Sequence, residues 1–246
     1  MKHFIPIILL LLLFTTSDAI AVNLPTLSLS VKDATKPAEI SKVLQILFLF
    51  TILSVAPAIL LMTTAFTRIV IVLGFVRQAM GTQNMPPNQV LVGLALFLTF
   101  FVMSPVINTI NDNAFQPYMK EDITQQEALE RSVGAMREFM FSQVRESELQ
   151  LLVDITEQKQ PTDRHDISTT ILIPAFMLSE LKLAFQMGFM IYVPFLVIDM
   201  IVASVLMSMG MMMLPPIIIS LPFKLLLFVL VDGWHLVVGS LMKSFG

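Results

Sequence analysis

Four charged residues in the most apolar part of this 246-residue chain are the first candidates for chemistry. Asp199 is the only charge between Lys182 and Lys224, and Glu180 and Asp232 stand at the borders of the same region. An ionised side chain in hydrocarbon costs roughly 2.5 to 3.5 kcal/mol, so such residues normally face protein, water or one another. The four residues therefore predict buried ion pairs or, in a less common case, ion coupling.

The sequence positions of these charges suggest how they pair. If two antiparallel helices meet at Pro215–Pro216, Asp199 and Asp232 lie sixteen residues on either side, at similar depth. Two adjacent carboxylates repel, so one would be protonated or both hydrated. Lys224 would lie level with Met207, without an acid at its own depth, and we expect it to find its acid on another subunit or through an interrupted helix. For Asp199, a plain hydrogen bond at a helix interface remains the alternative.

A run of methionines separates these charges. Five of the seven positions from Met207 to Met213 are methionine, and a double proline follows directly. Proline lacks an amide proton and ends a helix, while Gly210 is expected to loosen the backbone. Alternatively, these methionines are ordinary apolar residues at the tip of a helical hairpin.

The residue types exclude several functions. Cysteine is absent and the three histidines are far apart, so neither a disulfide nor a zinc site is predicted. Nucleotide-binding, serine-hydrolase and metalloprotease motifs are also absent. Asp199 with Asp232 is the one pair to consider for an aspartyl protease, and the motifs of that class are missing. The net charge of −3 argues against nucleic-acid binding. We predict a protein that is not an enzyme and needs no cofactor.

The elements that carry these residues are expected to be membrane helices. The chain is 56% hydrophobic and 13% charged, well below the quarter that is usual in soluble domains. Apolar stretches predict spans over residues 43–67, 90–107, 185–209 and 217–241, of which the first two are free of charge. Residues 66–87, which carry Arg68 and Arg77, are expected to be a short cytoplasmic connection.

The first 21 residues have the pattern of a secretory signal peptide. Lys2 and His3 precede the apolar residues 4–14, and a small-x-small site follows at residues 19–21. An uncleaved anchor is the alternative. Removal of this leader would place the new N-terminus outside the cytoplasm, the methionine turn inside, and the C-terminus outside.

A charged insert lies between the second and third predicted spans. Residues 112–166 hold 18 of the chain's 33 charged residues. Thr124 and Glu127 predict a capping box, and an apolar stripe follows on one helix face, formed by Leu129, Val133, Met136, Met140 and Val144. We expect a second helix near residues 148–157 and packing of the stripe on the spans or on a neighbouring copy. A solvated helical loop without partners is the alternative.

These observations predict an all-α protein of helical hairpins in four parts. The parts are a signal peptide (1–21), an N-terminal segment with a first hairpin (22–110), a periplasmic helical insert (111–170) and a second hairpin with the methionine turn (171–246).

Two long blocks carry a family resemblance. The stretch FTRIVIVLGFVRQAMGTQNMPPNQVLVGLALFLTFFVMSPV (66–106) resembles the first signature block of the flagellar biosynthetic protein FliP family. The stretch from LSELKLAFQMGF to DGWHLV (178–237) resembles the second. The family includes the matching export-gate subunit of virulence type III secretion systems.

The resemblance implies a noncatalytic pore subunit of the flagellar type III export gate. Five copies would assemble with FliQ and FliR into a closed helical cone that passes unfolded flagellar cargo, alongside further export proteins. The hairpins would lie at the bacterial inner membrane and on its periplasmic side, within the basal body. Apolar helices that look like spans could thus be covered by protein as well as by lipid.

The resemblance also implies roles for the residues singled out above. Met209, Met211, Met212 and Met213, with Met207, would form a gasket that closes the pore, and Gly210, Pro215 and Pro216 would form its hinge. Glu180 and Lys224 would pair between subunits, with Asp199 and Asp232 as further buried charges. The remaining alternative is a small-solute or ion transporter that uses Asp199.

Overall fold

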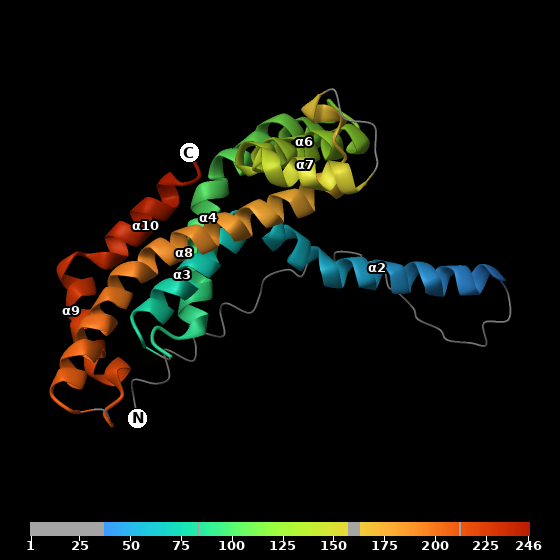
Figure 1. Ribbon diagram of the computed structural model, residues 1–246. Helices are drawn as coiled ribbons and strands as arrows, with labels where there is room; N and C mark the ends of the chain where they lie inside the picture. The colour runs from blue at the N-terminus through green and yellow to red at the C-terminus, as the bar shows by residue number, and fades with distance from the viewer. Residues whose placement is uncertain (1–36, 83, 157–162, 212) are drawn as a thin grey trace, which may run out of the picture. The chain divides into compact units, whose positions relative to one another are not determined.

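The structure is a computed structural model that describes residues 37–82, 84–156, 163–211 and 213–246. The predicted signal peptide therefore lies outside the described residues. All regular elements in the described part of the chain are helices, as predicted (Figure 1). The chain divides into two units, residues up to Phe50 and Thr51–Gly246, and helix α2 (Pro37–Met62) contains the division. From Leu44 to Met62 none of its side chains is buried.

Helix α3 (Phe66–Ala79) forms the centre of the core, although the sequence predicted a loop here. Its buried residues recur at spacings of three and four, as a helix face requires. That face packs against α4 (Asn88–Ile110) and α8 (Thr169–Ser208). The two arginines made this segment look like a connection. The core comprises Ala65, Ile69, Val72, Leu73, Val76, Ala79, Met80, Leu91, Ala95, Ala184, Phe195, Phe228, Val237 and Leu241.

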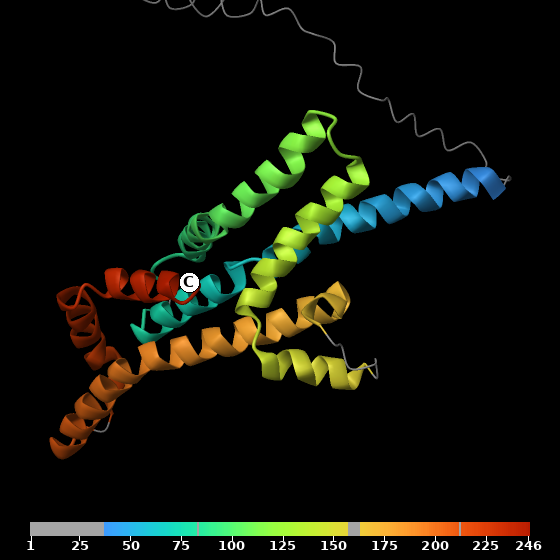
Figure 2. The ribbon, with the colours of Figure 1, turned by 90° about the horizontal axis from the view of Figure 1, so that it is seen from above.

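Helix α8 is the longest element. Its 40 residues span about 60 Å at 1.5 Å per residue. Figures 1 and 2 show α3 lying alongside it. Gly188 makes this close approach possible, because a Cβ there would come within 2.3 Å of the Phe75 ring. The predicted third span, 185–209, covers only the second half of this helix.

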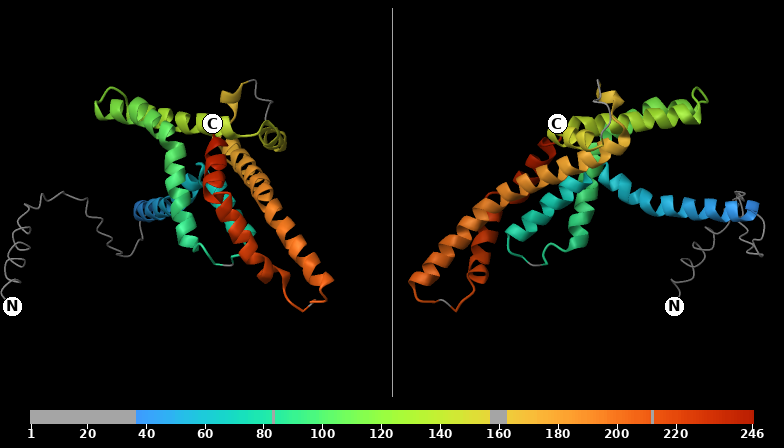
Figure 3. Two further views of the ribbon diagram at one scale, coloured as in Figure 1. Left: turned by 90° about the vertical axis from the view of Figure 1, so that its left-hand side faces the viewer. Right: turned by 45° about the vertical axis from the view of Figure 1, so that its right-hand side comes forward.

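The predicted fourth span is two helices. Helix α9 (Pro216–Leu230) and helix α10 (Gly233–Lys243) meet at an angle of 63°. The break lies at Asp232, whose backbone is left-handed (φ 51°). Figure 3 shows α9 and α10 returning beside α8. Among the described residues, three helices are long and apolar enough to cross a membrane, or four if this bent pair counts as one span.

The charged insert is helical, as predicted. Helix α4 continues through a π-helical turn, η2 (Asn111–Phe115), into α5 (Gln116–Met119). Helices α6 (Gln125–Gln143) and α7 (Glu146–Ile155) follow, and the short 3-10 helix η3 (Arg164–Asp166) precedes α8. The insert packs on the first turns of α8 through a second core, formed by Met140, Phe141, Val153, Ile167, Ile171, Leu172 and Phe176.

The predicted details of α6 are confirmed in part. Thr124 accepts a hydrogen bond from the Glu127 amide (3.3 Å), but the Glu127 carboxylate accepts from Arg131 (2.7 Å) instead of closing the capping box. Of the predicted apolar stripe, Met140 is buried, whereas Leu129 and Val133 remain exposed. The stripe therefore packs on α8 only at its C-terminal end.

Candidate functional site

The methionine turn joins α8 to α9 and is a defined structure. Met209 caps α8, and Gly210 follows with φ +76°. The Gly210 amide donates to the Met207 carbonyl (3.1 Å) and the Met211 amide to the Leu206 carbonyl (3.0 Å). These two bonds form a Schellman motif. Gly210 thus closes the helix in a left-handed conformation, which corrects the expectation that it loosens the backbone.

The double proline begins the second helix. Pro215 is extended (φ −66°, ψ 115°), and Pro216 is the first residue of α9. Proline is favoured at this position because its fixed φ suits a helix and its missing amide would have had no partner. The turn therefore lies between Ser208 and Pro216, and its centre is about four residues earlier than the sequence predicted.

The side chains of the turn are apolar and exposed. Met207, Met209 and Met211 are exposed, and Met213 is 98% exposed. Met212 lies outside the described residues. Leu214, Ile217 and Ile218 extend the exposed apolar surface into α9. Because no charged residue lies between Asp199 and Lys224, the whole tip of the hairpin lacks charge.

An ion pair joins the two helices behind this tip. Lys224 Nζ lies 2.6 Å from Asp199 Oδ2, and the Ser220 hydroxyl donates to Asp199 Oδ1 (2.5 Å). Lys224 and Ser220 are buried, and the Asp199 side chain is partly buried. The prediction that Lys224 needs an acid from another subunit is wrong. Asp199 precedes Met211 by twelve residues and Lys224 follows Met212 by twelve, so the true turn centre brings them level.

Asp232 does not meet Asp199. It follows Lys224 by eight residues, roughly 12 Å along a helix, and is exposed at the break between α9 and α10. The equal depth predicted for the two aspartates depended on the wrong turn centre. The structure therefore does not form the carboxylate pair that aspartyl protease chemistry would need.

The second buried ion pair joins α3 to α8. The Arg68 guanidinium donates from Nε to Glu180 Oε2 (2.9 Å) and from Nη2 to Glu180 Oε1. It also donates to the carbonyl (2.8 Å) and hydroxyl (3.0 Å) of Ser244 and to Gln143 Oε1 (3.0 Å). All five of its N–H groups thus have acceptors. The guanidinium lies 3.9 Å from the centre of the Phe245 ring.

These contacts correct the predicted pairing of Glu180 with Lys224. Each residue has a partner within the chain, Arg68 for Glu180 and Asp199 for Lys224. Sequence reasoning missed Arg68 because we placed it in a loop. The signal was present: the residue stands within a helical pattern of apolar residues that continues through Ile69, Val72 and Val76.

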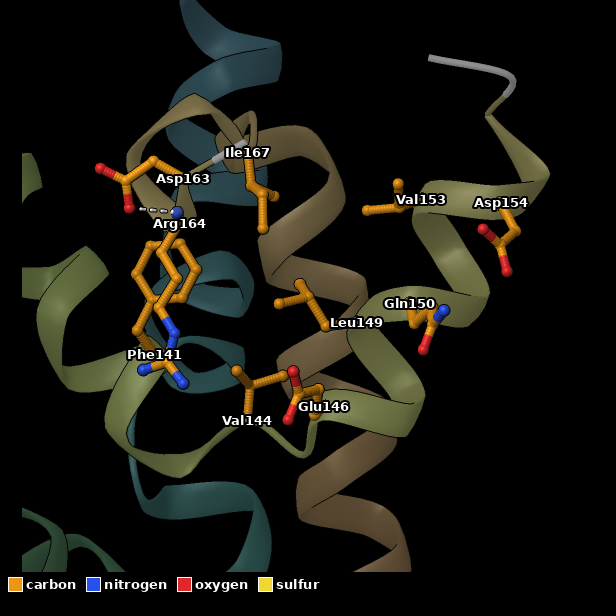
Figure 4. A pocket seen from close by; sticks show the side chains of 10 residues that line it. All are labelled: Phe141, Val144, Glu146, Leu149, Gln150, Val153, Asp154, Asp163, Arg164 and Ile167. Atoms are coloured by element: carbon orange, nitrogen blue, oxygen red, sulfur yellow. Dashed lines mark hydrogen bonds between the residues drawn. The ribbon is translucent and has the colours of Figure 1, made fainter. Parts of the chain in front are cut away.

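The insert contains a pocket of about 530 Å³ between α6, α7 and η3. Figure 4 shows its three carboxylates, of Glu146, Asp154 and Asp163, apart from one another. The described residues include no group of three His, Cys, Asp or Glu side chains placed to hold a metal ion.

Helices α7 and α8 are also joined at the surface. Lys182 Nζ lies 2.7 Å from Glu148 Oε1, with the Lys182 side chain half exposed. This hydrogen bond holds the pKa of Glu148 below its ordinary value. The pair fastens the insert to the long helix.

Comparison with known proteins identifies a family. The sequence matches the FliP family over residues 49–241. It is 54% identical to the flagellar biosynthetic protein FliP of Bacillus subtilis over 217 residues, which cover 88% of this chain and 98% of that protein. It is 55% identical to FliP of Pectobacterium carotovorum (82% of this chain, 78% of that protein) and 49% identical to FliP of Aquifex aeolicus (82% and 85%).

Proposed function

Because the chain belongs to the FliP family of flagellar biosynthetic proteins, we propose that it is a pore subunit of the flagellar export gate whose methionine turn seals the pore. The family is a structural component of the flagellar export apparatus and not an enzyme. The apolar helices are those of a membrane-embedded component of the flagellar basal body.

The exposed methionine turn is the observation that carries this proposal. An apolar constriction excludes water and ions by dewetting. Methionine is unbranched and has a polarizable sulfur, so it can repack around different side chains of a passing chain. Met209, Met211, Met212 and Met213 of several copies, with Met207, form the collar.

The stem behind the turn is suited to hold this collar in place. The Schellman motif at Gly210 and Pro216 at the start of α9 define both ends of the turn. The Asp199–Lys224 pair fixes the register of the two helices about three turns of helix away from it. Movement can then be confined to the methionine side chains and the short turn, while the hairpin keeps its shape.

The apolar surface of the hairpin supports assembly with other apolar chains. Phe185, Phe189, Leu196 and Met200 are exposed along one face of α8. Such a surface needs cover from protein or lipid. In an assembly of five copies, neighbouring copies together with FliQ and FliR cover this surface, at the inner membrane and on the periplasmic side of that membrane. Unfolded flagellar subunits pass through the resulting channel.

A crosslinking experiment tests the path of the cargo. The chain has no cysteine, so Met213→Cys introduces a single thiol at the tip of the turn. A flagellar cargo that carries one cysteine and a folded plug is stalled during export. We expect a disulfide between Met213→Cys and this cargo. The matched control is Met190→Cys, at another exposed methionine on α8 far from the turn. Equal crosslinking at both positions, or none at position 213, contradicts the proposal.

The alternative function, ion transport through Asp199, has less support. Ion coupling needs an acid that can bind and release an ion, and both Asp199 oxygens are engaged, by Lys224 and Ser220. Asp199→Asn separates the two functions. A transporter would lose its flux while its assembly stayed intact, whereas a structural pair predicts a weakened hairpin.

A further inference from the structure

Arg77 and Asp232 are charges on the second hairpin and its neighbour α3 that have no ion pair in the described part of the chain. The Arg77 guanidinium, on α3, has one long hydrogen bond, from Nη1 to the Pro86 carbonyl (3.5 Å). The Asp232 carboxylate, between α9 and α10, is exposed and makes no capping hydrogen bond. Their charges are opposite, and within the chain they are not within ion-pair distance of each other.

The position of Arg77 along the axis of α8, here called its height, follows from the contacts between α3 and α8. The two helices run parallel, and the Phe75 ring packs against Gly188. Arg77 stands two residues further along α3 and is therefore about level with Met190 on α8.

The height of Asp232 follows in the same way from α9. This helix runs antiparallel to α8, and the Phe228 ring packs against Phe195, with 6.3 Å between ring centres. Asp232 stands four residues further along, two residues past the end of α9 at Leu230, and therefore lies near the level of Ile191. The two charges thus lie at similar positions along α8.

The surroundings of Arg77 suit a helix that carries an acid. A hollow of about 500 Å³ runs along α3 past Ile71, Gly74 and Arg77, and Ile217 of α9 also lines it. Gly74 leaves open space above the helix backbone, so another backbone can approach closely. The hollow is apolar toward Ile71 and polar toward Arg77.

Asp232 lies on a surface that matches this hollow. Val229, Leu230, Val231 and Leu236 around it are all exposed and apolar. A carboxylate on such a surface does not face lipid, because an ionised group in hydrocarbon is strongly disfavoured. It needs water or a cation from a protein.

We propose that Arg77 of one copy binds Asp232 of the next copy, with the α9–α10 bend seated in the hollow along α3. The proposal rests on the assembly of several copies in the proposed function and names the contact between them. Copies related by rotation about an axis roughly along α8 keep their positions along that axis, so the similar positions of the two charges allow them to meet. Such a head-to-tail contact, with different patches on its two sides, gives a ring if the rotation between copies closes and an open helix if it does not.

A charge exchange tests the pair. Arg77→Glu and Asp232→Arg are each expected to reduce the yield of the assembled complex about tenfold or more, because like charges then meet at the contact. The double variant restores the pair in reverse and is expected to recover most of the assembly. A double variant as defective as the single ones overturns the proposal.

A crosslinking experiment covers the case in which charge reversal prevents folding. Cells express two tagged forms of the chain, one with Arg77→Cys and the other with Asp232→Cys, and a short bifunctional thiol reagent is added. We expect a dimer that carries both tags and that is absent when either variant is expressed alone. Phe97→Cys, an exposed site on α4, replaces Arg77→Cys in the control.

The outcomes separate this inference from the proposed function. If the wild-type chain forms a multimer but position 77 gives no mixed dimer, the pair is wrong and the pore proposal stands. Crosslinking of position 77 to a different protein also overturns the pair. If the wild-type chain forms no multimer at all, the proposed function fails and the inference fails with it.

Discussion

The buried Arg68–Glu180 pair gives the sharpest test of what holds this fold together. Glu180→Gln keeps the size of the side chain and removes its charge. Arg68 is 1% exposed and Glu180 is fully buried, so water cannot replace the lost carboxylate. Removing one partner of a buried pair typically costs about 3 to 5 kcal/mol. That cost corresponds to a hundredfold or more in the ratio of folded to unfolded chain.

The remaining bonds of Arg68 set the expected size within this range. The guanidinium keeps its acceptors at Ser244 and Gln143 after the substitution, so the loss falls near the lower end, at about 3 kcal/mol. For a chain of this length, about 2–4 °C of melting temperature corresponds to each kcal/mol. Glu180→Gln should therefore lower the melting temperature in detergent by roughly 10 °C, measured by circular dichroism of the helices.

Two further variants make the test specific to burial. Lys182→Ala breaks an ion pair on the same helix that is exposed to solvent, and it should change the melting temperature little. Arg68→Met together with Glu180→Leu removes both buried charges and should recover about half or more of the loss, because apolar pairs often replace buried ion pairs well. Equal effects of Glu180→Gln and Lys182→Ala would refute the reasoning.

Three further predictions concern packing, hairpin register and pH. Gly188→Ala should destabilise the chain by about 1–3 kcal/mol, because its Cβ would clash with the Phe75 ring. Gly93→Ala, whose Cβ would have no atom within 4 Å, should be neutral or stabilising, and melting curves compare the two variants. Lys224→Met should lower the melting temperature because it leaves Asp199 without its cation, and adding Asp199→Leu should restore it. A double variant that melts at a lower temperature than the single variant would argue against the pair. Because the pKa of Glu148 is lowered, its pair with Lys182 stabilises the chain at pH values above the ordinary pKa of 4.5. This contribution disappears as the pH falls through the lowered pKa, so Lys182→Ala should flatten the acid side of a stability–pH profile.

Sequence reasoning predicted the helical class because apolar periodicity and a low share of charge depend only on local composition. It also placed the insert helices and the hairpin with its methionine tip. It missed α3, since two arginines in a short segment resemble a cytoplasmic loop. The fold contradicts that interpretation by burying Arg68 with five hydrogen bonds, which only the tertiary structure supplies.

Two errors in the candidate site, the partner of Lys224 and the pairing of Asp199 with Asp232, have one common cause. We took Pro215–Pro216 as the centre of the turn, whereas Pro216 begins α9. A shift of four residues is about one helical turn, enough to change the partner of Lys224 from an acid on another subunit to Asp199. Proline marks the boundary of a helix, but the sequence alone does not say on which side of it the turn lies.

The most direct test of the central claim is the ion conductance of the assembled gate. The complex is reconstituted into planar bilayers with Met209, Met211 and Met213 replaced by alanine. The matched control replaces the exposed methionines of α8, Met190 and Met200, by alanine. We predict a closed wild-type gate, a closed control, and a steady current through the first variant, because alanine leaves a wider, hydrated opening. The claim that the methionine turn seals the pore would be contradicted if the first variant conducted no more ions than the wild type. It would also be contradicted if the control conducted as much as the first variant.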